Sequence, residues 1–329
     1  MLTAKSADEP YVEAAVANRG GDYACRGCGK PVILKQGRVR ASHFAHHPGS
    51  ECSYGALMSP EHLKAQRVLA DAFRGRGVEV ELEAPIASLV GDRRADVLAW
   101  PSERPSAKIA VEVQASDITI ELIDARTRSY GSEGVAPLWL RLYDFGKWES
   151  PQTFVGRSTI WIEKHRLRSW ERWAYDHLGG RLWFMDSHTF RVWRGTFVQA
   201  HRYNEVTTWF GPGGTEESAG GDWREIVQWV EVSLEGPFSV DELRLSRGRV
   251  RGPDGATRLA AWFLAPGEET PPRDPPVRAI FLKAKPPAYF SPRQVQMRSG
   301  DAWVKAAFEG APDNWRGHPM TTSADRREA

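Results

Sequence analysis

The feature that most constrains the fold of this chain is residues 22–55, where possible metal ligands take the place of apolar side chains. These ligands are Cys25, Cys28, Cys52, His43, His46 and His47. The 3 cysteines of the chain all lie here, which is too few for a disulfide framework. Because so few apolar residues cannot form a core of their own, we predict that a bound metal ion holds the segment together.

Zinc is the ion that suits a mixture of thiolate and imidazole ligands. We predict a structural Zn²⁺ site made by Cys25, Cys28, His46 and Cys52, with His43 as the alternative histidine ligand. Four protein ligands leave no open coordination position, so this ion would serve folding and not catalysis. The alternative is that the cysteines are reduced and bind no metal.

The same segment is basic, and its cations suggest contact with phosphates. The candidate nucleic-acid-binding residues are Lys30, Lys35, Arg38 and Arg40. The whole chain has 44 Lys and Arg against 42 Asp and Glu, so a nucleic-acid surface must be local. The alternative is an ordinary solvated surface that keeps the module in solution.

The next region alternates between helical and extended patterns. Ser59 as N-cap and Pro60 at the first helical position begin a helix that ends near Phe73. The segments that follow are strands at Val78–Ala84, Ala95–Trp100 and Ile109–Ala115, a helix at Ile118–Tyr130 and a strand at Pro137–Leu142. We therefore predict an α/β core with the order helix, three strands, helix, strand.

Four polar residues stand where this pattern calls for apolar packing: Glu61, Asp96, Glu112 and Gln114. Glu112 and Gln114 share one face of their strand, and Asp96 comes close to Glu112 if the two strands pair. Two neighbouring carboxylates repel each other, and Mg²⁺ or Mn²⁺ would relieve that repulsion. Taken singly, each residue also fits an ordinary helix-turn or strand-surface position.

Helical spacing places Glu61 on the stripe of Ala65, Val68 and Ala72. We therefore expect Glu61 to face inward and to approach the same ion. His62 points about 100° away from Glu61, so we expect it to be a surface or packing residue, although it could also relay a proton.

Several segments resemble the competence protein CoiA-like family, whose core resembles the PD-(D/E)XK restriction-endonuclease-like nucleases. They are the cysteine segment through Ser42-His43-Phe44-Ala45-His46, then Ser59-Pro60-Glu61-His62, Arg94-Ala95-Asp96-Val97 and Val111-Glu112-Val113-Gln114. The resemblance covers about residues 20–145. It implies a restriction-endonuclease-like fold and metal-dependent cleavage of phosphodiester bonds, in DNA rather than RNA, during DNA processing or recombination.

Carried over to this sequence, the resemblance makes Asp96 and Glu112 the Mg²⁺ or Mn²⁺ ligands and Glu61 an added ligand. Gln114 stands where the wider nuclease superfamily usually has lysine, and a neutral amide can orient a water molecule but cannot offset negative charge. The missing charge could come from Lys64, Arg94 or Arg126.

Four segments are expected along the chain: residues 1–55 with the zinc module, 56–146 with the nuclease-like core, 147–312 as a Trp-rich α+β domain, and 313–329 as a disordered tail. In the Trp-rich part we predict a helix at about Ile162–Leu178, whose tryptophans either pack in the core or stack on bases.

No apolar run reaches the roughly 18 residues of a membrane span and no secretion signal is visible, so we expect a cytoplasmic protein without a membrane partner.

Two functions of different classes remain after the sequence analysis. The first is a Mg²⁺-dependent nuclease with Asp96, Glu112, Gln114 and Glu61 in its catalytic site. The second is a nucleic-acid-binding or protein-binding adaptor that keeps this scaffold with a degenerate site, as the glutamine at position 114 suggests.

Overall fold

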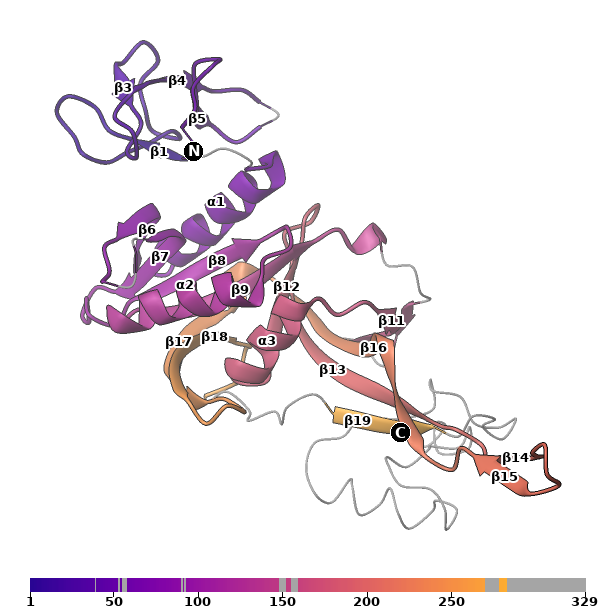
Figure 1. The fold of residues 1–329 in the computed structure, drawn as a ribbon. Helices are drawn as coiled ribbons and strands as arrows, with labels where there is room; N and C mark the ends of the chain where they lie inside the picture. Colours follow the sequence, from indigo (N-terminus) through magenta and orange to yellow (C-terminus); the bar gives the residue numbers. More distant parts are fainter. Residues whose placement is uncertain are drawn as a thin grey trace. The chain divides into compact units, whose positions relative to one another are not determined.

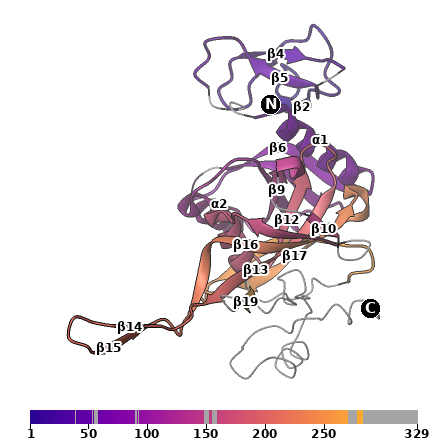
Figure 2. The same cartoon turned by 90° about the vertical axis from the view of Figure 1, so that its right-hand side faces the viewer.

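The computed structural model describes residues 1–38, 40–52, 54, 58–89, 91, 93–147, 152–154, 159–269 and 278–282 (Figures 1 and 2). The chain forms two compact units. Unit 1 takes in Met1–Gly146, Ser169–Arg194 and the described part of Gly236–Pro272; unit 2 takes in the described parts of Lys147–Arg168, Gly195–Glu235 and Arg273–Ala329. The segment borders expected from the sequence stay predictions, and residues 313–329 lie outside the described part.

Unit 1 begins with a small β module that holds the cysteine segment. Its strands are β1 (Thr3–Ala4), β2 (Val12–Glu13), β3 (Tyr23–Ala24), β4 (Pro31–Lys35) and β5 (His43–His46). β1 pairs with β2, and β3, β4 and β5 form an antiparallel sheet. A small apolar cluster that includes Ala14, Val32 and Phe44 lies under these strands, so the module has little core of its own.

Helix α1 (Pro60–Arg74) follows the module and begins as the sequence predicts. The Ser59 hydroxyl accepts a hydrogen bond from the backbone N–H of His62 at 3.2 Å, and Pro60 occupies the first turn. The buried face of α1 carries Leu63, Gln66, Leu69, Ala70 and Phe73, among others. Ala65 and Ala72, from the stripe predicted to contain Glu61, are buried in the same apolar cluster as Leu69, whereas Glu61 itself is exposed.

The core of unit 1 is a mixed sheet with the strand order β12-β9-β8-β7-β6. Its elements in chain order are β6 (Val78–Ile86), β7 (Arg93–Pro101), β8 (Ile109–Gln114), α2 (Ile120–Ser132), β9 (Ala136–Tyr143) and β12 (Leu182–Asp186). β6, β7 and β8 are antiparallel neighbours, whereas β8–β9 and β9–β12 are parallel pairs. The predicted order of helix, three strands, helix and strand is confirmed, and so is a mixed α/β fold.

The two helices cover opposite faces of this sheet (Figures 1 and 2). Leu69 of α1 belongs to the same buried apolar cluster as Val97 of β7 and Val111 of β8. Tyr130 of α2 belongs to a second cluster, together with Ala110 of β8. The 3-10 turn η2 (Val240–Glu242) and the antiparallel hairpin of β17 (Arg244–Arg251) and β18 (Thr257–Leu264) add further residues to the first cluster.

The predicted helix at Ile162–Leu178 is wrong in its first part. Residues Thr159–His165 form strand β11, and helix α3 runs only from Ser169 to His177. Ile160, Trp161 and Ile162 are all buried, as in a strand that is covered on both faces, and such a continuous apolar run does not distinguish a strand from a helix. Trp170 and Trp173 of α3 are 1% and 7% exposed, so these side chains are packed and are not available to stack on bases.

In its described residues, unit 2 has strands as its regular structure, apart from the 3-10 turn η1 (Phe145–Lys147) at its border with unit 1. The strands are β10 (Gln152–Phe154), β11, β13 (Val192–Tyr203, whose first residues belong to unit 1), β14 (Thr207–Phe210), β15 (Glu216–Ala219), β16 (Trp223–Phe238, whose last residues belong to unit 1) and β19 (Arg278–Leu282). β10 pairs with β11, β11 with β16, and β14 with β15 in antiparallel fashion.

Candidate metal centres and the buried carboxylate pair

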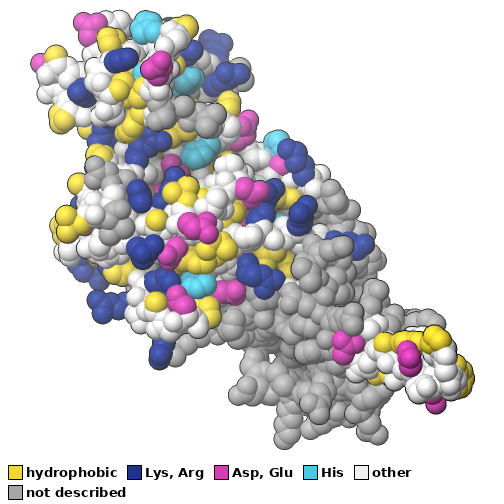
Figure 3. Space-filling model, viewed as in Figure 1, with side chains coloured by type: hydrophobic (Ala, Val, Ile, Leu, Met, Phe, Trp, Pro, Cys, Tyr) yellow, Lys and Arg dark blue, Asp and Glu magenta, His cyan; other side chains and the backbone are white. Residues whose placement is uncertain are grey.

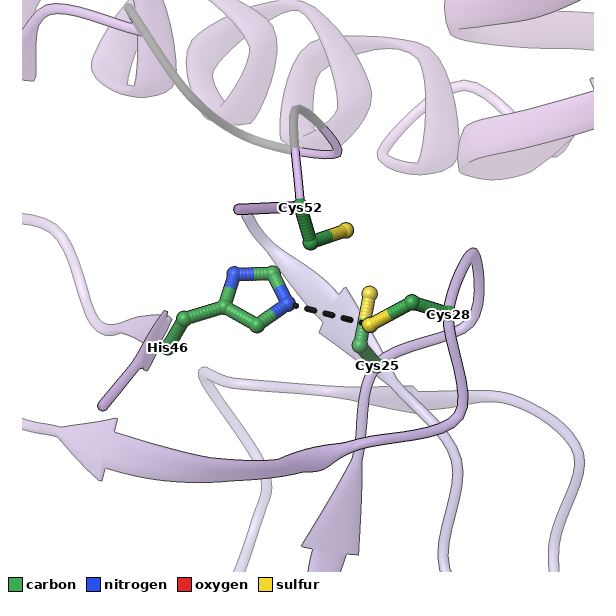
Figure 4. Close-up of side chains that lie close together, drawn as sticks. All are labelled: Cys25, Cys28, His46 and Cys52. Atoms are coloured by element: carbon green, nitrogen blue, oxygen red, sulfur yellow. Dashed lines mark hydrogen bonds between the residues drawn. The ribbon is translucent and has the colours of Figure 1, made fainter. Parts of the chain in front are cut away.

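The first candidate site is the cysteine and histidine cluster of the module. Cys25 follows β3, Cys28 lies in the next turn, His46 ends β5 and Cys52 comes after it. The ligand atoms of these four residues all lie within 4.8 Å of one another, and Figure 4 shows the four side chains pointing toward one another. The predicted ligand set is therefore brought together, and it could hold a structural metal ion, with zinc as the ion that fits three thiolates and an imidazole.

The structure also distinguishes between the two candidate histidine ligands, because only one of them lies in the cluster. His46 Nε2 lies 3.5 Å from Cys28 Sγ, inside the cluster. His43 Nδ1 instead makes a hydrogen bond with the Ala41 carbonyl oxygen at 2.9 Å. The pKa of the Cys28 thiol falls to about 6, because the Lys30 backbone N–H and, to a smaller degree, the His46, Cys52 and Cys25 side chains stabilise its thiolate. A thiolate is the form that binds a metal.

The second candidate site surrounds Asp96 of β7, whose carboxylate is 8% exposed by residue. The paired residues of β7 and β8 end at Val97, which lies opposite Val111. Asp96, the next residue along β7, bonds to β8 through its side chain. Asp96 Oδ2 accepts a hydrogen bond from the Val113 backbone N–H at 2.9 Å. Helix α1 supplies two more contacts: Gln66 Nε2 donates to Oδ1 at 2.7 Å, and His62 Nε2 lies 3.2 Å from Oδ2.

Glu112 of β8 is the neighbouring buried carboxylate, at 3% exposure. The Tyr130 hydroxyl of α2 donates a hydrogen bond to Glu112 Oε1. Arg126 Nη1, one helical turn earlier, lies 3.4 Å from Glu112 Oε2. Helix α1 therefore holds Asp96, and helix α2 holds Glu112.

The two carboxylates influence each other's ionisation. Burial, and then repulsion by Asp96, raises the pKa of Glu112 to about 7, although Arg126 and Tyr130 act in the opposite direction. Burial also favours neutral Asp96, but the pKa of Asp96 is lowered overall because His62 and the Val113 N–H stabilise its charge. The pKa of His62 is raised, because attraction to Asp96 and Glu112 outweighs the effect of its burial. Such a shifted pair is typical of functional sites.

Glu61 does not join this pair, and the prediction that it faces inward is wrong. Its side chain is exposed at the start of α1, where its own backbone N–H and the Ser59 hydroxyl lower its pKa. The expectation that His62 is a surface or packing residue is also wrong, since its side chain is 16% exposed and touches Asp96. Ala65 and Ala72 of the predicted stripe are buried, but Glu61 lies in the first turn, where its carboxylate stays in water and is stabilised by the helix dipole.

Gln114 lies at the end of β8, beyond Glu112, and its amide nitrogen donates to the Ser116 carbonyl oxygen at 2.7 Å. Of the cations that could replace the missing lysine charge, Arg126 contacts Glu112, whereas Lys64 lies 4.7 Å from the Phe190 ring centroid and Arg94 lies 4.2 Å from that of Tyr54.

Gln66 was not among the predicted site residues. Its sequence position indicates a buried polar contact, because it is a polar residue on an apolar helix face, four residues after His62.

The four candidate nucleic-acid-binding cations are all exposed, but they do not line one surface. Lys35, Arg38 and Arg40 line a hollow of about 1010 Å³ on the module. Lys30 lines a different hollow, together with Arg126 and Tyr130.

These features define a class of protein, a small module with a cluster of possible metal ligands joined to a mixed α/β core. Residues 8–55 match the family described as competence protein CoiA, N-terminal domain, and residues 59–207 match competence protein CoiA, nuclease-like domain. The chain therefore belongs to the competence protein CoiA-like family, as its sequence motifs predicted. No helix in the described part of the chain is long and apolar enough to cross a membrane.

A curated relative is competence protein CoiA of Bacillus subtilis (strain 168), which is 30% identical over 124 residues. The match covers 37% of this chain and 31% of that protein, so the chain spans about a third of the relative's length. A crystal structure of the protein of unknown function AF1548 matches with a TM-score of 0.21 and 16% identity, over 26% of this chain and 50% of that one. A likeness at this level carries no conclusion about fold or function.

Proposed function

We propose that the protein is a metal-dependent nuclease that hydrolyses phosphodiester bonds in DNA, in DNA processing or recombination. The family's nuclease-like domain supports a nuclease-related role. The observation that carries the proposal is the buried pair of Asp96 and Glu112, each held by hydrogen bonds from a different helix. The order of helix, three strands, helix and strand around the pair supports a restriction-endonuclease-like core.

Asp96 and Glu112 fit a divalent cation such as Mg²⁺ or Mn²⁺. Mg²⁺ is usually bound through one or two carboxylates and completes its shell with water and substrate oxygens. The raised pKa of Glu112 reflects burial and repulsion by Asp96, and a cation between the two carboxylates would offset both costs. Among the described residues Asp96 and Glu112 would hold the ion, without Glu61.

A bound cation would lower the pKa of a water molecule and polarise the scissile phosphate. The chain's own residues would prepare the site: His62 and Gln66 orient Asp96, and Tyr130 orients Glu112. Gln114 would position the attacking water with its amide, after turning away from Ser116. Arg126 would stabilise negative charge on the phosphate in the transition state, a role that lysine usually fills in the wider superfamily.

The alternative is an adaptor that binds nucleic acid or protein without cleavage. The two carboxylates already have cationic partners, because His62 pairs with Asp96 and Arg126 pairs with Glu112. These ion pairs favour the adaptor, since the carboxylates then need no metal ion. The amide of Gln114 is also engaged with Ser116. In this case the pair would be a structural ion-pair network that needs no added cation.

Incubation of the purified protein with labelled single-stranded and double-stranded DNA, with and without Mg²⁺ or Mn²⁺, separates the two functions. A nuclease cleaves only with the metal, and both Asp96→Asn and Glu112→Gln lower the rate at least 100-fold. Glu61→Gln is the matched control, because this carboxylate is exposed and should leave the rate within threefold of wild type. Binding without cleavage under every metal condition would favour the adaptor, and RNA in parallel reactions tests the preference for DNA.

A further inference from the structure

A hollow of about 690 Å³ in unit 1 lies between the cysteine knuckle of the module and helix α2. The module contributes Lys30 and Tyr54 to its lining, and the core contributes Arg93, Arg94, Arg126 and Tyr130. We call this hollow the knuckle groove. Figure 3 shows dark-blue Lys and Arg side chains where the module meets the core.

The knuckle groove is strongly cationic. Four of its lining residues are Lys or Arg, and Glu51 is the one acidic residue in the lining that the structure describes. Arg94 lies with its guanidinium 4.2 Å from the Tyr54 ring centroid, and its Nη1 is buried without a hydrogen-bond partner in the described part of the chain. The positive charge of the lining side chains would attract an anion that enters the groove.

Two residues in the lining of the knuckle groove connect it to the buried carboxylate pair. Arg126 and Tyr130 line the groove and also contact the two oxygens of Glu112. A ligand in the groove would therefore lie one side chain away from Glu112.

Hydrogen bonds between the module and the core hold the two walls of the groove in place. The backbone N–H and the hydroxyl of Thr3 donate to Glu83 Oε2 at 3.0 and 2.8 Å. Arg26, next to Cys25, forms an ion pair with Glu81 at 2.8 Å. Because these contacts are buried or half-buried, the groove is formed before a ligand arrives, which reduces the entropy cost of binding.

We propose that the knuckle groove binds the sugar-phosphate backbone of one DNA strand and leads it from Lys30 past Arg94 to the Asp96–Glu112 pair. This inference rests on the proposed function and adds a path for the substrate. A hollow of this size suits a ligand of a few hundred cubic ångströms, that is, a short single-stranded segment and not a whole duplex. The cations of the groove would follow its phosphates.

The test compares two charge reversals of exposed cations. Lys30→Glu alters the knuckle groove, and Arg104→Glu is the matched control, because Arg104 is exposed in the segment after β7 and does not line the groove. Fluorescence anisotropy with a labelled single-stranded 20-nucleotide DNA (a length of about 20 covers the ~4–16 nucleotides of known strand-binding sites) measures affinity. No divalent cation is added, so cleavage is absent, and no chelator is used, so the cysteine cluster keeps its metal.

We expect Lys30→Glu to weaken binding at least tenfold and Arg104→Glu to change it less than twofold. Lys30→Ala, which removes a single phosphate contact, should reduce the slope of log affinity against log salt by about 0.7. Equal effects of the two reversals, or no binding of the strand by the wild-type protein, would overturn the proposal. Thermal unfolding and zinc content identify a variant that fails to fold, and Lys30→Ala then decides the outcome.

The same experiment separates this inference from the proposed function. Strand binding that depends on Lys30, without cleavage by the wild-type protein when Mg²⁺ is added, would support the groove and reject the nuclease. Metal-dependent cleavage that Lys30→Glu leaves unchanged, with unchanged binding, would reject the groove alone.

Discussion

Substitution of Glu112 by glutamine should stabilise the metal-free protein at pH 8 and leave its stability nearly unchanged at pH 5. The pKa of Glu112 is raised from 4.5 to about 7 in the folded chain. The folded chain therefore holds this proton more tightly than the unfolded chain between these two pH values. The stabilising effect of the proton is fully present below about pH 4.5 and is lost as the pH rises through 7.

The size of the effect follows from the same shift. At about 1.4 kcal/mol for each pKa unit, a rise from 4.5 to about 7 corresponds to a loss of about 3–4 kcal/mol when Glu112 ionises. Glutamine has the shape of the neutral carboxylic acid and cannot ionise, so it avoids this loss. Its carbonyl oxygen can still accept the hydrogen bond from the Tyr130 hydroxyl.

Urea denaturation at pH 5, 6, 7 and 8, followed by tryptophan fluorescence, measures the difference between variant and wild type at each pH. Glu103→Gln is the control, because Glu103 is exposed in the turn after β7 and should give no difference at any pH. Added Mg²⁺ should stabilise the wild-type protein at pH 8 but not Glu112→Gln, since the variant lacks one of the two carboxylates. A variant that is less stable than wild type at pH 8 would refute the reasoning, because Arg126 and Tyr130 would then outweigh burial and repulsion.

Three further predictions concern other parts of unit 1. His46→Ala and Cys52→Ser should lower the zinc content measured by elemental analysis below half of the wild-type value, whereas His43→Ala should retain the metal because His43 is bonded to Ala41; equal losses would contradict the assigned ligand set. His62→Ala should lower the rate of metal-dependent DNA cleavage by about 10- to 100-fold, because Asp96 loses one of its orienting partners; an unchanged rate would show that His62 has only a structural role. Glu83→Ala should lower the free energy of unfolding by about 1–3 kcal/mol in urea denaturation, since the Thr3 N–H and hydroxyl lose their acceptor; Glu79→Ala, on the exposed side of β6, should have little effect, and equal losses would contradict this account.

Local spacing determined the parts of the site that lie close together in the sequence. The Cys25 and Cys28 pair with His46 and Cys52 predicted the ligand cluster, because a metal ion imposes its own geometry on nearby ligands. The alternation of Val111, Glu112 and Val113 identified a polar position in a buried strand. The strand and helix order of the core also followed from local patterns.

Tertiary packing decided which polar residues of helix α1 face the sheet. The apolar side chains of this helix form one broad face, and the sequence does not show where the edge of that face lies. The part of the face with Leu63, Leu69 and Phe73 buries the larger side chains, so it faces the sheet and brings Gln66 and His62 to Asp96. Glu61, in the first turn, is left in solvent.

The sequence by itself therefore determined the cluster of possible metal ligands, the order of the core elements and the two buried carboxylates, because each follows from local spacing or local patterns along the chain. Only the tertiary structure decided the partners of those carboxylates and the hollow in which Lys30 lies. These depend on how helices and the module pack against the sheet, and packing sums many weak contacts between residues far apart in the chain.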